Sequence, residues 1–383
     1  MFKIIKKDSG TKARLGLLTT KNGTIETPVF MPVGTIGTVK SLSPFEIYGE
    51  GFKIMLSNAY HLFLRPGTDV IEKFGSLRKF TGYGGSILTD SGGFQIFSLA
   101  KFAKIKNGGV EFMSHIDGET HFFTPERVIE IQKILDSDIM MQLDVFSGHG
   151  VKKERAEKDL DTTLRWAEKS IEAKKTGVFN RRTERKTGTG NEARYEAEKD
   201  NLLFLITQGN FFEDLREKSA RIMSGLDADG YAIGGLAVGE TKETMLEMLG
   251  ISASNLPETK PRYIMGVGTP ADIVKAVALG IDMFDCVLPT RNARNGFVFT
   301  SRGTVNIKNS VYKSETLPID PECSCFCCKN FGAAYVRHAF MSREIFSQRL
   351  LTVHNLHFYQ NLIMQIRKSI ENGNFYEFYK NYD

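Results

Sequence analysis

The sequence has few cysteines, no long apolar run and little excess charge, and each absence excludes a class of protein. Four of its five cysteines lie within six residues near the C-terminal end, which is not the spread framework of a small secreted protein. No apolar run reaches the roughly 18 residues of a membrane-spanning helix, and the opening MFKIIKKDSG lacks the apolar stretch of a signal peptide. The net charge of +5 permits a polyanionic partner without requiring one. A cytoplasmic protein without a membrane anchor is therefore expected.

Short apolar runs that end in polar residues or glycine recur along the chain. Runs of this kind are typical of strands buried on both faces. There are eight of them: TPVFMPVG (27–34), FKIMLSN (52–58), GSILTDSGG (85–93), SDIMMQLD (137–144), LLFLITQG (202–209), GYAIGGLA (230–237), PRYIMGVG (261–268) and DMFDCVLP (282–289).

Helical patterns separate most of these runs. The clearest are TPERVIEIQKILDSD (124–138), which has a typical helix start, and TKETMLEMLG (241–250) and TPADIVKAVALG (269–280), which both end in glycine. Eight strands that alternate with helices predict an α/β fold of the (β/α)₈ barrel type. A doubly wound parallel sheet is the alternative.

Three further segments complete the predicted domain organisation. Asn22-Gly23 between two strand-like runs predicts a β-hairpin. Residues 174–200 are polar and charged, and we expect a mobile insertion there, whose basic residues either touch nucleic acid or are simply solvated. The barrel, with the hairpin and the insertion, is expected to span residues 1–303, and a metal-binding subdomain with closing helices residues 304–383.

Polar residues stand at the ends of several predicted strands. In a (β/α)₈ barrel these ends meet at one mouth, where the chemistry takes place. A single aspartate there more often caps a helix, but three at equivalent positions indicate acid–base or covalent chemistry at a carbon–heteroatom bond. Asp282 competes with Asp285 for such a role. The residues at these ends are Asn58, Asp90, Asp144, Gln208, Gly235 and Asp285.

Glycines follow two of these strand ends, in TDSGGFQ (89–95) and GGLAVGE (234–240). They either let the backbone approach a flat ligand or only mark tight turns.

The clustered cysteines form a C-x-C-x-x-C hook of Cys323, Cys325 and Cys328. Thiolates at this spacing can bind one Zn²⁺ ion, which prefers four sulfur or nitrogen ligands. The side chains of Cys327 and Cys328 diverge, so only one of them is expected to bind that ion. Three thiolates and one imidazole leave no open position for water, which indicates a structural metal. The spacing does not choose the fourth ligand among His338, His354 and His357.

Seven blocks in order along nearly the whole chain resemble those of the tRNA-guanine transglycosylase family. The resemblance implies a bacterial-type enzyme with a barrel and a zinc-bearing insertion. Such an enzyme exchanges guanine at wobble position 34 of tRNAs with a GUN anticodon for a 7-deazaguanine base, in queuosine modification. It also implies a double displacement through a covalent ribosyl–aspartate intermediate, and a homodimer. The blocks are NAYHLFLRPG, LTDSGGFQIFSL, ITQGNFFEDLR, YAIGGLAVGE, MGVGTPADI, FDCVLPTRNARNG and CSCFCC with TVHNLHFY.

The same resemblance assigns roles to individual residues. Asp285 matches the nucleophile, Asp90 the general acid/base and His354 the fourth zinc ligand. The implied substrate-binding residues are Asn58, Ser91, Gly92, Gly93, Phe94, Asp144, Gln208, Gly235, Leu236 and Met265. The implied RNA-binding residues are Gly266, Val267, Gly268, Thr269, Pro270, Ala271, Asp272, Thr290, Arg291, Asn292, Ala293 and Arg294.

Two departures from the family pattern bear on the incoming base. The insertion at 174–200 is longer than usual, and Val145 and Phe146 take the places of a Glu and a Cys of bacterial relatives. The block GGLAVGE, with the Leu236 backbone and Glu240, favours preQ1. Phe146 offers apolar surface for the larger queuine, unless its ring only fills the core. A non-catalytic tRNA-binding subunit is a further alternative, but both Asp90 and Asp285 are present.

Overall fold

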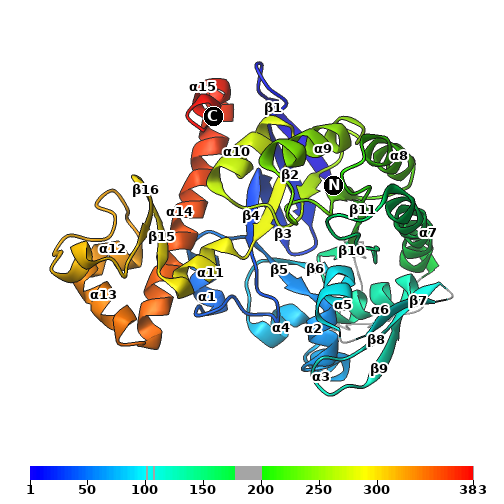
Figure 1. The fold of residues 1–383 in the computed structure, drawn as a ribbon, viewed down its shortest axis with the longest axis horizontal. Helices are drawn as coiled ribbons and strands as arrows, with labels where there is room; N and C mark the ends of the chain where they lie inside the picture. The colour runs from blue at the N-terminus through cyan, green and yellow to red at the C-terminus, as the bar shows by residue number, and fades with distance from the viewer. Residues whose placement is uncertain (101, 107, 177–200, 383) are drawn as a thin grey trace, which may run out of the picture.

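The computed structural model describes residues 1–100, 102–106, 108–176 and 201–382. Eight parallel strands form one sheet in the order β4-β14-β13-β12-β11-β10-β6-β5. A parallel bridge between Val33 and Leu56 joins the two ends of the sheet, and helices surround it (Figure 1). The predicted (β/α)₈ barrel is confirmed, and the doubly wound alternative is wrong because such a sheet stays open.

All eight predicted runs form the strands of the barrel. Each apolar run supplies the strand itself, and the polar or glycine residues that end it begin the following loop. The strands are β4 (Val29–Pro32), β5 (Ile54–Asn58), β6 (Ser86–Asp90), β10 (Ile139–Met141), β11 (Leu202–Thr207), β12 (Gly230–Ile233), β13 (Arg262–Ile264) and β14 (Met283–Cys286).

The helices around the barrel begin largely where the sequence predicts. Thr124 caps α6 by accepting a hydrogen bond from the Arg127 amide. The predicted end of α9 at Gly250 is wrong: the helix continues to Ser254, because its buried face extends through Ala253. The helices are α1 (Pro44–Gly49), α2 (Ala59–Leu64), α3 (Thr68–Phe74), α4 (Leu77–Thr81), α5 (Gly93–Leu99), α6 (Pro125–Leu135), α7 (Lys153–Thr176), α8 (Glu213–Ser224), α9 (Lys242–Ser254), α10 (Pro270–Ala278) and α11 (Leu288–Asn295).

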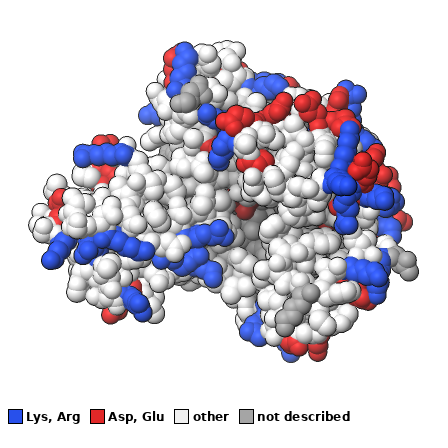
Figure 2. Space-filling view, viewed as in Figure 1, with Lys and Arg blue, Asp and Glu red and all other residues white. Residues whose placement is uncertain are grey.

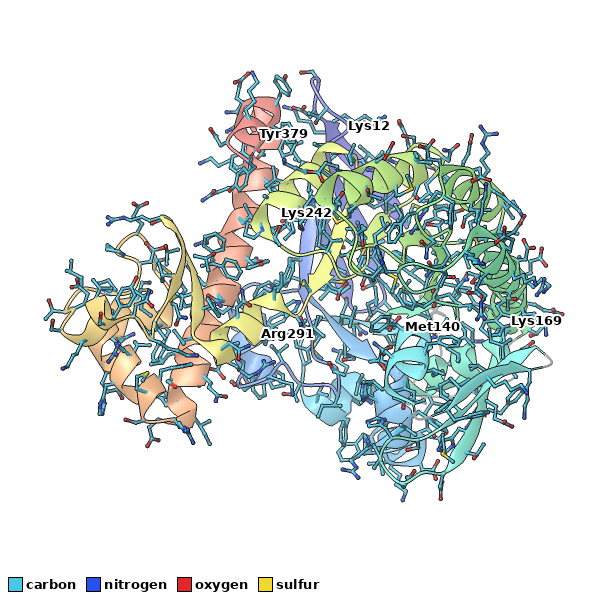
Figure 3. All side chains as sticks on the ribbon, in the orientation of Figure 1. Lys12, Met140, Lys169, Lys242, Arg291 and Tyr379 are labelled. Carbon is cyan, nitrogen blue, oxygen red and sulfur yellow. The ribbon has the colours of Figure 1, made fainter. Side chains whose placement is uncertain are left out.

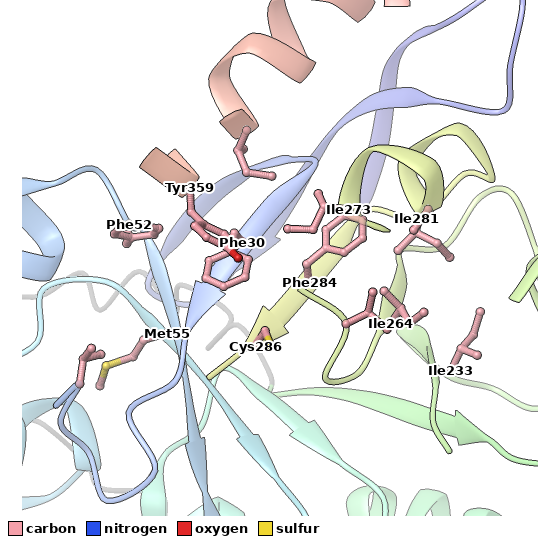
Figure 4. Packing of buried hydrophobic residues seen from close by; sticks show 14 of the residues in the cluster. Phe30, Phe52, Met55, Ile233, Ile264, Ile273, Ile281, Phe284, Cys286 and Tyr359 are labelled. Atoms are coloured by element: carbon pink, nitrogen blue, oxygen red, sulfur yellow. The ribbon is translucent and has the colours of Figure 1, made fainter. Parts of the chain in front are cut away.

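Side chains alternate along each strand between the barrel interior and the surrounding helices. Outward residues such as Phe30, Phe284 and Ile264 pack towards Ile273 of α10 and Tyr359 (Figure 4). The interior residues form a separate cluster, and they fix which positions at the strand ends face the mouth of the barrel. The interior cluster contains Leu18, Ile25, Val29, Met31, Ile54, Leu56, Leu88, Ile139, Met141, Phe204, Ile206, Ala232, Tyr263 and Met283.

Two antiparallel sheets accompany the barrel. The first, β1 (Phe2–Lys7), β2 (Arg14–Thr20) and β3 (Gly23–Thr27), contains the predicted hairpin, whose loop is Lys21-Asn22. The second, β7 (Ala103–Lys106), β8 (Gly109–Met113) and β9 (Thr120–Phe123), lies between α5 and α6. The sequence analysis missed this second sheet because its strands are short and partly exposed.

A lobe beside the barrel carries the clustered cysteines (Figure 1). It consists of β15 (Phe297–Thr300), β16 (Gly303–Asn306), η1 (Ser310–Lys313), α12 (Phe326–Asn330) and α13 (Ala333–Met341). The long helix α14 (Ile345–Asn372) runs from this lobe along the barrel, where it packs on β4, α10 and α11, and α15 (Phe375–Lys380) follows it. The expected boundary after residue 303 falls on the first residue of β16, which pairs with β15, and the division stays a prediction.

The predicted insertion at 174–200 and the expected absence of a membrane-spanning helix can be compared with the described residues. Residues 174–176 of the predicted insertion belong to α7, and the remainder, 177–200, lies outside the described residues. In the described part of the chain, no helix is both long and apolar enough to cross a membrane.

Candidate active site

A cavity of about 290 Å³ lies at the C-terminal ends of the barrel strands. Ser91, Gly92 and Gly93 are not among its lining residues: Ser91 and Gly92 form the turn between β6 and α5, and Gly93 is the first residue of α5. The residues that the sequence analysis singled out and that line the cavity are Asn58, Asp90, Phe94, Asp144, Phe146, Gln208, Gly235, Leu236, Met265, Gly266 and Asp285.

The polar residues reach the cavity because they continue the inward register of their strands. Asp285 lies two residues after the interior residue Met283, and Asp90 lies two after Leu88. Side chains two apart on a strand point to the same face, so both carboxylates face the mouth. The same spacing relates Leu56 to Asn58, Ile206 to Gln208 and Tyr263 to Met265.

Asp282, the competitor of Asp285, has a different place. It precedes Asp285 by three positions and therefore points to the other face of the strand. Arg14 forms a buried ion pair with it, with 2.6 Å between Nη2 and Oδ2, and the Arg262 amide donates to the same oxygen at 2.7 Å. Asp282 is not among the residues that line the cavity. Its geometry is that of a structural ion pair.

Asp90 has the surroundings of a group that can exchange a proton near neutral pH. Asn58 donates a hydrogen bond from Nδ2 to Oδ2 of Asp90 at 2.9 Å. Burial, together with the charges of Asp144 and Asp285, raises the pKa of Asp90 to about 7. An acid of this pKa can act as donor in one step and as acceptor in the next.

Asp144 and Gln208 form a hydrogen-bonded pair in the cavity wall, with 2.7 Å between Nε2 of Gln208 and Oδ2 of Asp144. Burial raises the pKa of Asp144 to about 6, although the hydrogen bond from Gln208 opposes this increase. Glycines make room for the pair: a Cβ at Gly93 would lie 2.7 Å from Oδ1 of Asp144. Gly235 has a φ of +68°, and its Cβ would lie 2.4 Å from Oε1 of Gln208. The close approach of the backbone to Asp144 and Gln208 therefore requires glycine at both positions. From the sequence, these glycines could also have served only to form tight turns.

Asp285 is held through one of its two oxygens. Oδ1 accepts hydrogen bonds from the Tyr263 hydroxyl at 2.5 Å and from the Gly266 amide at 2.8 Å. Burial raises the pKa of Asp285, and these two hydrogen bonds oppose the increase. The three cavity carboxylates thus have three different sets of partners.

Two phenylalanines form an aromatic wall of the cavity. The rings of Phe94 and Phe146 meet edge to face, with 5.0 Å between their centroids and an interplanar angle of 77°. Both line the cavity, so the alternative that Phe146 only fills the core is wrong. Its neighbour Val145 is the buried residue of the two.

Arg216 of α8 is a residue that the sequence analysis missed. Its guanidinium is fully buried and donates to the carbonyl oxygens of Asn210 at 2.7 Å and Gly234 at 2.8 Å. Asn210 in turn donates from Nδ2 to the carbonyl of Gly148 at 2.9 Å. Arg216 thereby joins the loops that follow β10, β11 and β12. An arginine in an amphipathic helix normally faces water, so its sequence position gave no signal.

The lobe contains a candidate metal site formed by Cys323, Cys325, Cys328 and His354, whose ligand atoms lie within 4.8 Å of one another. Nδ1 of His354 faces the sulfurs, while its Nε2 lies 2.7 Å from the Phe299 carbonyl. A hydrogen bond at Nε2 leaves Nδ1 free to bind a metal, as in known histidine sites. The four residues therefore fit one tetrahedral ion.

The other two histidines that the spacing allowed do not belong to this cluster. His357 contacts Oε2 of Glu50 through Nδ1 at 2.9 Å and the Ser324 hydroxyl through Nε2 at 3.2 Å. The side chain of His338 lies on α13 and has no place among the four ligands.

The predicted RNA-binding residues occupy two segments: 266–272 form the loop before α10 and its first turn, and 290–294 lie within α11. Arg291 is exposed on α11, between the barrel and the lobe (Figure 3). Exposure differs within the set: Val267, Gly268, Asp272, Thr290 and Ala293 are buried, whereas Gly266, Thr269, Pro270, Ala271, Asn292 and Arg294 are at least partly exposed.

Comparison with known proteins gives one consistent result. The family model described as Queuine tRNA-ribosyltransferase matches residues 8–383. The Queuine tRNA-ribosyltransferase of Dictyoglomus turgidum is 49% identical over 382 residues, which cover 100% of this chain and 94% of the relative. Proteins of the same description from a Thermoanaerobacter species and from Francisella tularensis are 48% and 47% identical over 381 residues, covering 100% of this chain and 96% and 97% of the relatives.

Proposed function

Because this chain belongs to the queuine tRNA-ribosyltransferase family, we propose that it exchanges guanine at wobble position 34 of GUN-anticodon tRNAs for a 7-deazaguanine base. The observation that carries this proposal is a single cavity with three buried aspartates, each with different partners. Carboxyl groups in different surroundings have different pKa values, so one can act as acid/base, one can bind the base and one can act as nucleophile.

In the proposed reaction, the wobble guanosine leaves the base stack and enters the cavity. Asp285 attacks C1′ of its ribose, the bond between C1′ and the base breaks, and protonated Asp90 gives its proton to the departing guanine. The incoming base then gives a proton to Asp90 and attacks C1′ from the vacated side, releasing Asp285. Two displacements retain the configuration at C1′ and give ping-pong kinetics.

The remaining cavity residues are proposed to recognise the base. Asp144 and Gln208 present an acceptor and an amide to its hydrogen-bonding edge. The backbone at Gly235 and Leu236 contacts the base, and Met265 forms an apolar wall. The pairing of Asp144 with Gln208 supports this role, because it fixes both groups before a ligand arrives.

We favour preQ1 as the incoming base. The Glu240 carboxylate accepts hydrogen bonds from the amides of Ala237 at 2.5 Å and Val238 at 2.9 Å, in the loop that lines the cavity. A carboxylate behind this loop favours a cationic aminomethyl group. The aromatic pair of Phe94 and Phe146 is the observation that favours queuine as the second candidate, because it offers apolar surface.

Competition between bases tests both the reaction and this choice. Labelled guanine is first exchanged into unmodified tRNA, and its displacement by preQ1 or queuine is then measured. We expect displacement at lower concentration by preQ1. Displacement by queuine at far lower concentration would make queuine the substrate. Phe146→Cys should then shift the preference towards preQ1 by about 10-fold or more, and Val145→Ala, which changes only the buried neighbour, should not. Failure of guanine to enter tRNA at all would contradict the proposed function.

The charge of the molecule supports a tRNA that lies across the lobe. Residues 288–349 carry nine Lys and Arg but four Asp and Glu, an excess that equals the whole formal charge of +5. Blue side chains extend from the middle of the view across the lobe (Figure 2). Within the described residues, none of the basic side chains of this segment except Arg349 forms an ion pair. The other eight therefore have no carboxylate partner that competes with a phosphate, although Arg294 and Arg337 donate to backbone carbonyl oxygens.

Replacing Arg291 by Ala should weaken tRNA binding and reduce the slope of log K against log salt by about one unit, if the side chain meets one phosphate. Arg294→Ala tests the second cation of α11 in the same way. Arg165→Ala on α7, which is also exposed, is the matched control and should leave the slope unchanged. Binding measured between low and physiological salt gives the slopes. Unchanged slopes for both α11 variants would show that these arginines have a structural role.

For the metal site we propose one structural Zn²⁺ per chain, because three thiolates and one imidazole are a preferred zinc set with no position left for water. When bound, the ion joins the loop before α12 to α14. The homodimer and the cytoplasmic location stay predictions.

A further inference from the structure

The two oxygens of the Asp285 carboxylate have different surroundings. Oδ1 accepts from the Tyr263 hydroxyl at 2.5 Å and from the Gly266 amide at 2.8 Å. Oδ2 accepts no hydrogen bond from any residue within the described ranges. Since Asp285 lines the cavity, one oxygen is held by the protein and the other is left for a ligand.

Tyr263 is rigidly placed and remains a donor. Its ring is fully buried in the barrel interior on β13, among the apolar side chains of the interior cluster. Burial and the neighbouring Asp285 charge raise its pKa well above the ordinary value. The hydroxyl therefore keeps its proton at any pH at which the protein works, and it can only donate to the carboxylate.

Three carboxylates in one buried cavity oppose one another's ionisation. The proposed chemistry needs Asp285 ionised while Asp90 still holds a proton. Hydrogen bonds from Tyr263 and Gly266 stabilise the ionised form of Asp285, and Asp90 lacks a hydroxyl donor of this kind among the described residues. A hydroxyl aimed at only one of the two acids therefore separates their protonation states.

We propose that Tyr263 is a positioning residue for the nucleophile: it holds Oδ1 of Asp285, so that Oδ2 attacks C1′, and it keeps this carboxylate ionised. This inference rests on the proposed function. In the step, the bond between Oδ2 and C1′ forms and the bond between C1′ and the guanine nitrogen breaks. The electron pair of the broken bond stays on the nitrogen, and the Asp90 proton neutralises the leaving base. Asp285 becomes an ester and Asp90 a carboxylate.

The test is the pH dependence of covalent adduct formation in Tyr263→Phe, which removes one hydroxyl and keeps the ring. The rate falls on the acidic side as Asp285 takes up a proton. Loss of a donor raises its pKa, so this acidic limb should move to higher pH by about one to two units. The ratio of variant to wild-type rate should therefore rise with pH, from a loss of about 10- to 100-fold below the limb to a much smaller loss above it.

Tyr231→Phe is the matched control. Tyr231 is also a buried strand tyrosine, on the neighbouring strand β12, but its hydroxyl contacts the Leu226 carbonyl, at 3.3 Å, and not Asp285. It should leave the acidic limb in place. A rate ratio for Tyr263→Phe that stays flat across pH, or an equal shift in Tyr231→Phe, would overturn the inference.

Two variants distinguish a failure of the proposed function from a failure of the role of Tyr263. If Asp285→Ala still forms the adduct, the nucleophile is wrong and the proposed function must be revised. If the adduct depends on Asp285 but Tyr263→Phe has the wild-type pH profile, only the role of Tyr263 is wrong. Thermal unfolding of each variant shows whether its folded fraction accounts for any loss of rate.

Discussion

Asp285→Ala is expected to abolish base exchange and the covalent tRNA adduct, with a rate loss of about 10⁴-fold or more. The reason is that a double displacement needs an oxygen nucleophile at C1′. Asp285 is the cavity carboxylate whose Oδ1 is held by a tyrosine hydroxyl and a backbone amide, while its Oδ2 accepts no hydrogen bond from the described residues. The adduct is measured as protein-bound tRNA on a denaturing gel, and exchange as labelled guanine that enters tRNA.

Asp282→Asn is the control for this prediction. It removes a charge from the residue directly before β14, where Asp282 forms the structural ion pair with Arg14. Leaving Arg14 buried without its partner should cost about 3–5 kcal/mol of the free energy of unfolding, so the melting temperature should fall. The adduct formed per folded molecule should be unchanged. An adduct that persists in Asp285→Ala and disappears in Asp282→Asn would exchange the two roles.

Cys328→Ala should cause the largest loss of stability, because it removes one of four predicted zinc ligands. Binding of structural zinc contributes about 10–16 kcal/mol in small zinc peptides, as much as the total stability of a typical domain. The wild-type protein should contain one zinc per chain, and the variant should contain much less and unfold in its lobe. Metal analysis and hydrogen exchange of the lobe measure the two effects.

Cys327→Ala is the matched control, since Cys327 is the buried neighbour of Cys328 in α12 but lies outside the four-residue cluster. It should keep one zinc per chain and lose only a little stability. Full zinc content in Cys328→Ala, or loss of zinc in Cys327→Ala, would contradict the ligand assignment. Because residues 288–349, which include the lobe, carry the excess positive charge, zinc loss should also weaken tRNA binding.

The sequence by itself determined the barrel and the neighbourhood of the site. A strand buried on both faces needs a continuous apolar run, so all eight strands were visible in the sequence, for example Leu202–Thr207. The residue that ends such a run must lie at the mouth, which identified Asp90 and Gln208. The sheet β7-β8-β9 was missed because strands that are half exposed carry no such run.

Tertiary structure alone decided which of several equivalent residues takes which partner. Asp282 and Asp285 share one apolar run, and only the closed barrel places Arg14 beside the first and Tyr263 beside the second. Spacing also left three histidines as candidates for the fourth metal ligand. In the structure, α14 places His354 next to the cysteines, and His357 contacts Glu50 instead. A local pattern reports burial, because burial depends on a residue's own side chain. A hydrogen-bond partner hundreds of positions away depends on how the whole chain closes.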